Sequence, residues 1–437
     1  MAENGAGVSP QLPASVSVLV VGAGVHGLST AWQLAERGES VLVLDKAGVA
    51  AGASGIACGV IRNNYFQPAM SELMAACVEV WESDPEVLHY HGNGYIALGP
   101  PSQERDLAEV HARQQRIGYP SELHVGEEEV TAHMRSLYPD WRATGITVCL
   151  HEHAGGYAFN RESMFGLADK ARAAGAEIVT GVEVTGFELD GSGAVTAVLT
   201  SAGTVAVEQV VVAVGPWIRS LWELLGLPDR LDVVQPNGSV LADQPMWTYW
   251  YLQEGEVVID PAGFVTADGR PSAVIHLDSD QSLRDDQGRL ITDEPWGIYF
   301  KPDRASVQGG AAPIRLGHEF SVDPYPSGTV DPGFPDMWCA ALSHCLERFA
   351  GSRQLYRQVR SGGVGAFTAD NFPVFDYMRP NVYVAADSNH GYKMIAVGRE
   401  IARVLRGEHS SLLAPFRYER FASGELHPVS NSPYPWS

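Results

Sequence analysis

The first regular pattern of apolar residues lies near the start of the chain. Residues 16–21 form a short run of mostly valine and leucine, which is typical of a buried strand. Residues 29–37 follow with apolar positions at helical spacing, and Gly38 ends this stripe. Residues 41–44 repeat the short apolar run, which closes at Asp45. The pattern predicts a strand, a helix and a second strand in succession, as in a doubly wound parallel sheet.

Helical and strand patterns then alternate up to about residue 230. The predicted helices are 70–81, 102–117, 126–137 and 161–174, and the predicted strands are 94–98, 177–180, 182–189 and 209–214. Asp-Gly-Ser-Gly at 190–193 predicts a hairpin turn.

The pattern changes between residues 231 and 324, where turn clusters separate alternating segments that are rich in aromatic residues. These segments are 246–252, 273–277 and 296–300, and they predict an antiparallel sheet in a second domain. A helix over 332–350, a strand over 381–386 and a helix over 395–405 follow, and this last unit is expected to sit beside the first one. The predicted fold class is therefore α/β (α+β), with a Rossmann-type domain interlaced with an antiparallel-sheet substrate domain.

Composition excludes several functions. The formal net charge of −22 argues against nucleic acid or an anionic membrane as a partner. The five cysteines include no C-x-x-C pair, so we expect free thiols, no disulfide framework and no metal site. The first fifteen residues are polar and lack basic residues, and no transmembrane span is apparent, so a cytoplasmic location is expected.

Glycines fill the turn between the first predicted strand and helix. Gly22, Gly24 and Gly27 have the spacing G-x-G-x-x-G. In a dinucleotide-binding unit the first glycine permits the tight turn, the second admits a pyrophosphate, and the third lets the helix pack on the strand. Asp45 stands where a carboxylate accepts the ribose hydroxyls, and its charge disfavours the 2′-phosphate of NADP. These residues predict a dinucleotide site but leave FAD and NAD both open.

Several further segments, taken in order, resemble one family over about 400 residues. These are GASGIACGVIR (52–62), GGYAF (155–159), VVVAVGPWIRSL (210–221), TADNFPVF (368–375) and NHGYKMIAVGREIA (389–402). The chain resembles the FAD-dependent D-amino acid oxidase (DAO) family, in the branch of sarcosine oxidase, glycine oxidase and dimethylglycine dehydrogenase. It departs from the family's motifs at Ala369, where a proline is usual, and at Asn389, where a glycine is usual.

The resemblance implies FAD as the cofactor and a discontinuous FAD-binding domain. That domain would comprise 1–90, 150–230 and 355–437, and the substrate-binding domain 91–149 and 231–354. The cofactor-binding residues that it implies are Gly22, Gly24, Val25, His26, Gly27, Asp45, Lys46, Ala53, Ser54, Gly55, Gly59, Val184, Ala213, Gly215, Trp217, Gly363, Asn389, His390, Gly391, Tyr392 and Lys393. Some family members attach FAD covalently, through a cysteine near the position of Gly363 or a histidine near the position of Cys58. This chain has neither residue there, so noncovalent FAD is expected, with a covalent link to Cys58 as the minor alternative.

The implied reaction oxidises the C–N bond of a small amino acid or N-substituted glycine. Hydride would pass to flavin N5, and the resulting imine would hydrolyse. Arg62 and Lys393 match the residues that hold the substrate carboxylate in the sarcosine oxidase branch. The rival interpretations are an oxidase of primary amines such as glycine or D-amino acids, an NAD-dependent dehydrogenase, and a flavin-binding protein without turnover.

Other candidates lie in the predicted substrate sheet. Tyr249, Tyr251, His276 and Tyr299 are candidates for the pocket wall, and packing in the core is the alternative for each. Lys301 or Gln308 is the candidate for the position where these oxidases activate oxygen, so oxidase and dehydrogenase both stay open. The expected partners are an amine substrate with a carboxylate and O2 or another electron acceptor, and the chain is expected to be a monomer or homodimer.

Overall fold

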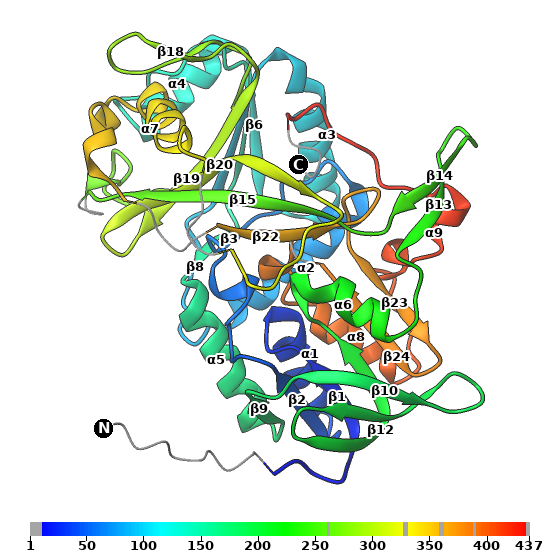
Figure 1. Ribbon diagram of the computed structural model, residues 1–437. Helices are drawn as coiled ribbons and strands as arrows, with labels where there is room; N and C mark the ends of the chain where they lie inside the picture. The colour runs from blue at the N-terminus through cyan, green and yellow to red at the C-terminus, as the bar shows by residue number, and fades with distance from the viewer. Residues whose placement is uncertain (1–10, 260–262, 327–330, 358–361, 388–389, 434–437) are drawn as a thin grey trace.

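The structure is a computed structural model that describes residues 11–259, 263–326, 331–357, 362–387 and 390–433. Two large sheets dominate it. The first contains β1, β2 and β12, the second contains β15, β19 and β20, and in the view of Figure 1 the second lies above the first. Each sheet combines segments that are far apart in the sequence, so the two parts of the molecule are interlaced. The mixed α/β fold class predicted from the sequence is confirmed.

The first sheet has a parallel centre. Its parallel strands are β1 (Ser15–Val21), β2 (Val41–Asp45), β9 (Glu177–Thr180), β12 (Gly203–Val212) and β24 (Val382–Ala386). Antiparallel strands β10 (Val184–Leu189), β11 (Val195–Thr200) and β23 (Val374–Arg379) extend it. β12 pairs with β1 along one edge, and with β11 and then β24 along the other. The C-terminal unit therefore joins the first sheet, with β12 between it and β1.

Alternate residues of β1 face two different cores. Val18 and Val20 pack into the core that contains α1 (Val25–Ala35), α5 (Asn160–Ala173) and α8 (Val397–Leu405). α1 contacts both α5 and α8, as Figure 1 shows. Leu19 and Val21 face the other core, which includes α6 (Ile218–Leu224). Because both faces are covered, the strand is apolar throughout.

The second sheet is mostly antiparallel. Its strands are β5 (Tyr95–Gly99), β6 (Ser121–Val125), β7 (Val148–Glu152), β15 (Thr248–Val257), β16 (Val274–Ser279), β19 (Trp296–Asp303), β20 (Ser306–Gly317), β21 (Tyr356–Arg357) and β22 (Gly362–Phe367). Only β5 and β16 pair in parallel among these described strands. β22 pairs with β15, so this sheet also takes in chain beyond residue 355. The expected domain boundaries stay a prediction.

Three helices cover the second sheet. α3 (Glu104–Ile117) packs on the face that carries Tyr95 and Ala97, whereas α4 (Glu127–Leu137) and α7 (Phe334–Cys345) share a core with Ile96 and Leu98. The period of two along a strand sends neighbouring residues of β5 to opposite faces. The antiparallel sheet predicted for 231–324 is confirmed in its central strands.

A small sheet connects the two large ones. It consists of β3 (Val60–Ile61), β8 (Gly156–Ala158) and β4 (Tyr90–His91), and α2 (Pro68–Ser83) lies between β3 and β4 in the chain. The remaining short elements are the pairs β13 (Arg230–Val234) with β14 (Val240–Pro245) and β17 (Leu283–Arg284) with β18 (Leu290–Thr292), and the helix α9 (Arg420–Ser423). No helix in the described ranges is long and apolar enough to cross a membrane.

Most predicted helices are confirmed within a few residues, and two predictions were wrong at an end. The first helix begins at Val25 rather than at residue 29, because the glycine turn leads directly into it. The helix predicted over 332–350 ends at Cys345, and a separate turn of 3₁₀ helix covers Glu347–Phe349. Leu346 between them has extended backbone angles, which ends the α-helical hydrogen bonding.

Candidate active site

The glycine turn brings β1, α1 and β12 into close contact. Gly22 has φ +107°, and a Cβ on it would lie 2.3 Å from the carbonyl oxygen of Ala213. A Cβ on Gly27 would lie 1.9 Å from the carbonyl oxygen of Gly22. Any side chain at either position would displace backbone, so both residues must be glycine for this geometry. The N-terminus of α1 consequently faces a cavity at the end of the parallel strands.

Asp45 is fixed at the end of β2 by backbone donors. Its Oδ2 accepts a hydrogen bond of 2.8 Å from Ala23 N, and its Oδ1 accepts bonds of 2.8 Å from Ala47 N and from Gly48 N. The carboxylate thus ties the glycine turn to the loop after β2. It lines the same cavity as the turn, in the position that suits a ribose.

A cavity of about 450 Å³ runs along the glycine turn. The sequence-predicted cofactor residues that line it are Gly22, Gly24, Val25, His26, Asp45, Lys46, Ala53, Ser54, Val184, Ala213, Gly215, Trp217, Gly391 and Tyr392. These residues come from six separate segments of the chain. The structure therefore brings fourteen of the predicted positions to one elongated site that is large enough for a nucleotide.

The other predicted cofactor positions lie elsewhere. Gly27 and Gly55 pack against backbone, since a Cβ on Gly55 would lie 1.8 Å from the carbonyl oxygen of Ala50. Gly59, Gly363, His390 and Lys393 line a second cavity. Asn389 lies outside the described residues.

His26 carries unsatisfied polar atoms at the first cavity. It is 4% exposed, and neither of its ring nitrogens has a hydrogen-bond partner within the described part of the chain. Burial lowers the pKa of His26, although Asp387 opposes this shift. A neutral imidazole with a free N–H fits a phosphate oxygen of a bound ligand, so this cavity suits the pyrophosphate of a dinucleotide.

The second cavity, of about 170 Å³, adjoins the first. Ala53, Ala57 and Tyr392 line both, so the second cavity lies directly beside the nucleotide cavity. Arg62, Lys393 and His276 all line this second cavity. Three of the side chains proposed from sequence for substrate binding therefore meet at one place, although they come from the connecting sheet, the C-terminal unit and β16.

Arg62 lies in an aromatic and acidic surrounding directly after β3. It is 8% exposed, and its Nη1 donates a hydrogen bond of 2.7 Å to the carbonyl oxygen of Asn64. Its guanidinium carbon lies 4.5 Å from the centre of the Tyr65 ring and 5.5 Å from that of Tyr95. Burial alone would lower the pKa of Arg62, but Tyr95, Tyr65 and Glu152 raise it above the ordinary value. The side chain is therefore a permanent cation.

Lys393 approaches the same tyrosine. Its Nζ lies 5.9 Å from the ring centre of Tyr65, and its backbone carbonyl accepts a hydrogen bond of 2.9 Å from Trp81 Nε1. Across the described ranges the Lys393 ammonium forms no hydrogen bond and no ion pair, and the buried Tyr65 hydroxyl also has no partner. Two cations and a free hydroxyl thus surround a small space, which favours a carboxylate ligand.

His276 is held by a relay of side chains. Its Nδ1 lies 2.6 Å from the Tyr95 hydroxyl, and its Nε2 lies 3.0 Å from Oδ1 of Asp278. Burial would raise the pKa of Asp278, but the hydrogen bonds from His276 and from Gln103 hold it below its ordinary value. The relay fixes the orientation of the Tyr95 ring beside Arg62.

Glu254 also lines this cavity, and sequence patterns did not single it out. It is 4% exposed; its Oε1 accepts a hydrogen bond of 2.7 Å from the Tyr299 hydroxyl and its Oε2 one of 3.0 Å from Gly362 N. Burial raises the pKa of Glu254 to about 7. One feature of the sequence could have pointed to Glu254: it is a carboxylate within the aromatic segment TYWYLQEGEV. Burying an acid in such a strand costs free energy unless the acid has a partner.

A second buried carboxylate supports the segment around Arg62. Glu152, at the end of β7, accepts a hydrogen bond of 2.9 Å from Asn63 N and one of 2.6 Å from Gln114 Nε2. Burial raises the pKa of Glu152 to about 7. This residue was likewise not singled out by the sequence, because its partners come from α3 and from the loop after β3.

Four predicted catalytic residues do not line either cavity. Tyr249 and Tyr251 belong to the core between the sheets, and the Tyr249 hydroxyl donates to the carbonyl oxygen of Pro216. Lys301 is buried and donates to Pro302 O and, at 3.0 Å, to Asp303 Oδ1. Gln308 lies opposite Lys301 in the register of β19 and β20, and its Nε2 approaches Oε2 of Glu254 at 3.5 Å.

The fold and the two cavities define a class of protein: an enzyme that binds an extended dinucleotide and places basic side chains beside it. A family model described as "FAD dependent oxidoreductase" (DAO) matches residues 17–404. The chain belongs to this DAO family of FAD-dependent oxidoreductases, and FAD is its cofactor. The family resemblance inferred from the sequence motifs is confirmed, and the interpretation as an NAD-dependent dehydrogenase was wrong, because the glycine motif alone does not distinguish the two nucleotides.

One curated relative matches nearly the whole chain, and another matches about half of it. The peroxisomal sarcosine oxidase of Homo sapiens is 24% identical over 422 residues, which cover 94% of this chain and 97% of that protein. Sarcosine oxidase subunit beta of Arthrobacter sp is 28% identical over 226 residues, which cover 50% of this chain and 55% of that subunit.

Solved structures share the fold. The L-proline dehydrogenase of P. horikoshii has a TM-score of 0.74 at 19% identity, and the match covers 95% of this chain and all of that one. The glycine oxidase of Geobacillus kaustophilus has a TM-score of 0.70 at 19% identity and covers 93% of this chain and 98% of that one.

Proposed function

We propose that this FAD-dependent oxidoreductase oxidises the C–N bond of a small amino acid, with N-substituted glycines as its principal substrates. The observation that carries the proposal is that Arg62 and Lys393 line one cavity, which shares lining residues with the nucleotide cavity. Two cations with no carboxylate bound to them in the described structure are matched to a carboxylate that arrives with the substrate. Its full-length likeness to a protein named as a sarcosine oxidase supports the same substrate class.

Bound FAD supplies the hydride acceptor. The chain's own residues orient the substrate: Arg62 binds one carboxylate oxygen or both, and Lys393 neutralises the remaining charge. Both cations lie near the ring of Tyr65, and its free hydroxyl donates a further hydrogen bond. The apolar wall formed by residues such as Ile298 and Val364 excludes water and thereby favours the neutral amine, whose lone pair assists the loss of hydride.

FAD is proposed to bind noncovalently. Cys58 is the cysteine that lines the second cavity, and burial together with Glu254 raises the pKa of its thiol well above the ordinary value. A thiol that stays protonated is a poor nucleophile toward a flavin ring. Denaturation in acid is therefore expected to release all of the flavin into the supernatant, whereas flavin that stays with the precipitated protein would contradict the proposal.

Flavin bleaching tests the substrate class. The holoenzyme is mixed anaerobically with N-methylglycine, N,N-dimethylglycine, proline, glycine and D-alanine, and the flavin absorbance is followed. We expect reduction to be fastest with an N-substituted glycine. Faster reduction by glycine or D-alanine would instead establish the primary-amine alternative. Opening the cell to air then separates an oxidase, which reoxidises at once, from a dehydrogenase that needs another acceptor.

Substitution of the two cations tests the carboxylate site. Arg62→Ala and Lys393→Ala are expected to weaken binding of the best substrate by on the order of 2–4 kcal/mol. Each substitution removes one of the cations that neutralise the buried carboxylate of the substrate. The methyl ester of the same substrate has no carboxylate and is expected to bind wild type and variants alike. Arg105→Ala is the control, because Arg105 is exposed and pairs with Glu109 on α3. Equal losses for the acid and the ester would show that these residues do not hold a carboxylate.

A further inference from the structure

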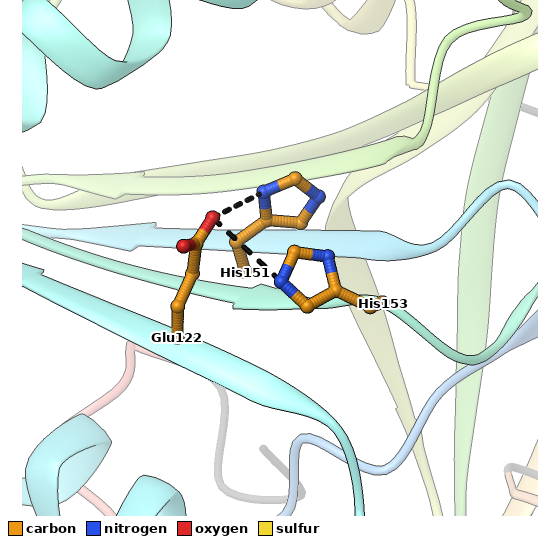
Figure 2. A group of neighbouring side chains, drawn as sticks. All are labelled: Glu122, His151 and His153. Carbon is orange, nitrogen blue, oxygen red and sulfur yellow. Dashed lines mark ion pairs between the residues drawn. The ribbon is translucent and has the colours of Figure 1, made fainter.

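Four histidines surround one carboxylate oxygen at the far edge of the second sheet, on the opposite side of β7 from Glu152. Oε1 of Glu122 lies 3.3 Å from His151 Nδ1 and 3.6 Å from His124 Nε2. It lies 3.7 Å from His153 Nε2 and 3.8 Å from His133 Nε2. Figure 2 shows the imidazoles of His151 and His153 turned toward the Glu122 carboxylate. This group is called the His–Glu cluster below.

The secondary structure holds the cluster together. Glu122 and His124 lie two residues apart on β6, and Glu122 is the cross-strand partner of His151 on β7. His153 follows β7 directly, and His133 comes from α4, which packs on the same face. Three separate segments therefore converge, and no short motif in the sequence marks them.

The distances match those of a coordination sphere. Imidazole and carboxylate ligands lie about 2.0–2.2 Å from Zn²⁺, so neighbouring ligand atoms of a tetrahedron are about 3.3–3.6 Å apart. His151 Nδ1 lies 3.2 Å from His133 Nε2 and 3.3 Å from Glu122 Oε1. The ligand atoms of Glu122, His151 and His153 all lie within 4.8 Å of one another, as do those of Glu122, His124 and His133. Only small side-chain rotations would bring such a set around one ion.

The chemistry of the donors also suits a metal. The cluster offers four imidazoles and one carboxylate, side chains that serve as ligands of transition metals in proteins. His124 Nε2 is in addition buried without a hydrogen-bond partner in the described structure.

We propose that the His–Glu cluster is a binding site for a divalent transition-metal ion of the Zn²⁺ type, with Glu122, His151 and His153 as ligands and His133 beside them. Nitrogen donors outnumber oxygen donors, which favours Zn²⁺ over Ca²⁺ and Mg²⁺. The site is separate from both cavities, because none of its residues lines either of them. It does not rest on the proposed function.

Metal analysis of the holoenzyme tests the site. The protein is stripped with EDTA, dialysed against ZnCl₂, passed through a desalting column, and analysed for zinc and flavin. We expect about one zinc per chain for three or four protein ligands, and a rise in melting temperature with Zn²⁺ but not with Mg²⁺. Zinc retained at no more than trace levels by the wild type would overturn the proposal.

Three variants locate the metal. Glu122→Gln and the double variant His151→Asn/His153→Asn are expected to lose the bound zinc and the Zn²⁺-dependent rise in melting temperature. His318→Asn is the control, because His318 is an exposed histidine that pairs with Glu319 elsewhere. Flavin content and the circular dichroism spectrum verify that each variant is folded. Because Glu122→Gln keeps the shape of the side chain, it still tests the site if the double variant does not fold. Zinc retained by Glu122→Gln and by the folded double variant at the wild-type level would place the ion elsewhere and refute the site.

Discussion

The hydroxyl of Tyr299 donates a hydrogen bond of 2.7 Å to Oε1 of Glu254, on the wall of the cavity that Arg62 and Lys393 share. Burial keeps the pKa of Glu254 at about 7, so this carboxyl holds its proton in mildly acidic solution and loses it above neutrality. A group with this behaviour at a proposed amine-oxidation site is able to take up a proton from the substrate ammonium.

We therefore expect flavin reduction to become faster as the pH rises through about 7, because only ionised Glu254 accepts a proton. Glu254→Gln is expected to remove this inflection from the pH profile measured by stopped-flow absorbance. Glu256→Gln is the matched control, since Glu256 lies two residues along β15, accepts from Ser306 and lines neither cavity. An inflection that persists in Glu254→Gln would show that another group controls the rate.

The same pKa has a consequence for stability. Between the usual glutamate value and about 7, the folded protein keeps the Glu254 proton that the unfolded chain has lost. Because the folded state then binds more protons, the free energy of unfolding falls as the pH rises through this window, by about 3 kcal/mol. Glu254→Gln is expected to flatten this part of the curve measured by urea unfolding. An unchanged slope in the variant would contradict the assignment.

Asp45 is expected to control FAD affinity. Asp45→Ala removes the acceptor of three backbone N–H groups and a ribose partner, so we expect FAD to dissociate about 10–100-fold more readily. Fluorescence of released flavin measures this. Asp190→Ala is the control, because Asp190 also accepts backbone hydrogen bonds at a turn, far from the nucleotide cavity. Similar FAD loss in both variants would indicate general loosening of the fold.

Gly27 is expected to tolerate no side chain. Gly27→Ala would place a Cβ 1.9 Å from the carbonyl oxygen of Gly22 and force α1 away from β1, at a cost of about 1–3 kcal/mol. Gly48→Ala is the control, because no atom lies within 4 Å of the added Cβ and its φ is not positive. Chemical denaturation of the apoprotein compares the two. A stability of Gly27→Ala equal to that of Gly48→Ala would contradict the packing role of the third glycine.

A buried ion pair explains the acid of the TADNFPVF segment. Asp370 pairs with Arg420 through Oδ2–Nε at 2.8 Å and Oδ1–Nη2 at 2.9 Å, and each side chain is 3% exposed. Asp370→Asn leaves the guanidinium without its counter-ion and is expected to cost about 3–5 kcal/mol of unfolding free energy. The control is Asp285→Asn, whose partner Arg289 is exposed. Equal unfolding midpoints for the two variants would refute a structural role for the buried pair.

The pH dependence of this pair has the opposite sign to that of Glu254. Burial would raise the pKa of Asp370, but the hydrogen bonds and charge of Arg420 hold it below its ordinary value. The stability that the pair contributes is therefore complete above the unfolded carboxyl pKa and is lost as the pH falls through the lower folded value. Acid unfolding of Asp370→Asn is expected to be less steep than that of the wild type.

Local chemistry made part of this site predictable. The glycine spacing and Asp45 act through backbone contacts close in sequence, so their positions in the nucleotide cavity followed from the pattern alone. Arg62 and Lys393 were identified only through family motifs, because 331 residues separate them. The fold brings them to one tyrosine ring through the connecting sheet and the C-terminal unit.

The residues that line the second cavity were harder to predict from the sequence. Tyr249 and Tyr251 share the alternation of a half-buried strand, but their face of β15 meets the core between the sheets. Glu254, on the other side of a register shift in β15, faces the cavity instead. Which face of an aromatic strand meets a ligand depends on the packing of whole sheets, and no single segment contains that information.

The two faces of strand β7 serve two different sites, so its sequence is constrained on both faces. Glu152 hydrogen-bonds to the segment that carries Arg62, while His151 and His153 on either side of it turn toward Glu122 on the other face. Sliding this strand by one residue would exchange the two faces, burying a histidine beside Asn63 and exposing the carboxylate. Insertions or deletions within β7 should thus be far more damaging than substitutions, since one shift in register would disable the support of the substrate cavity and the cluster together.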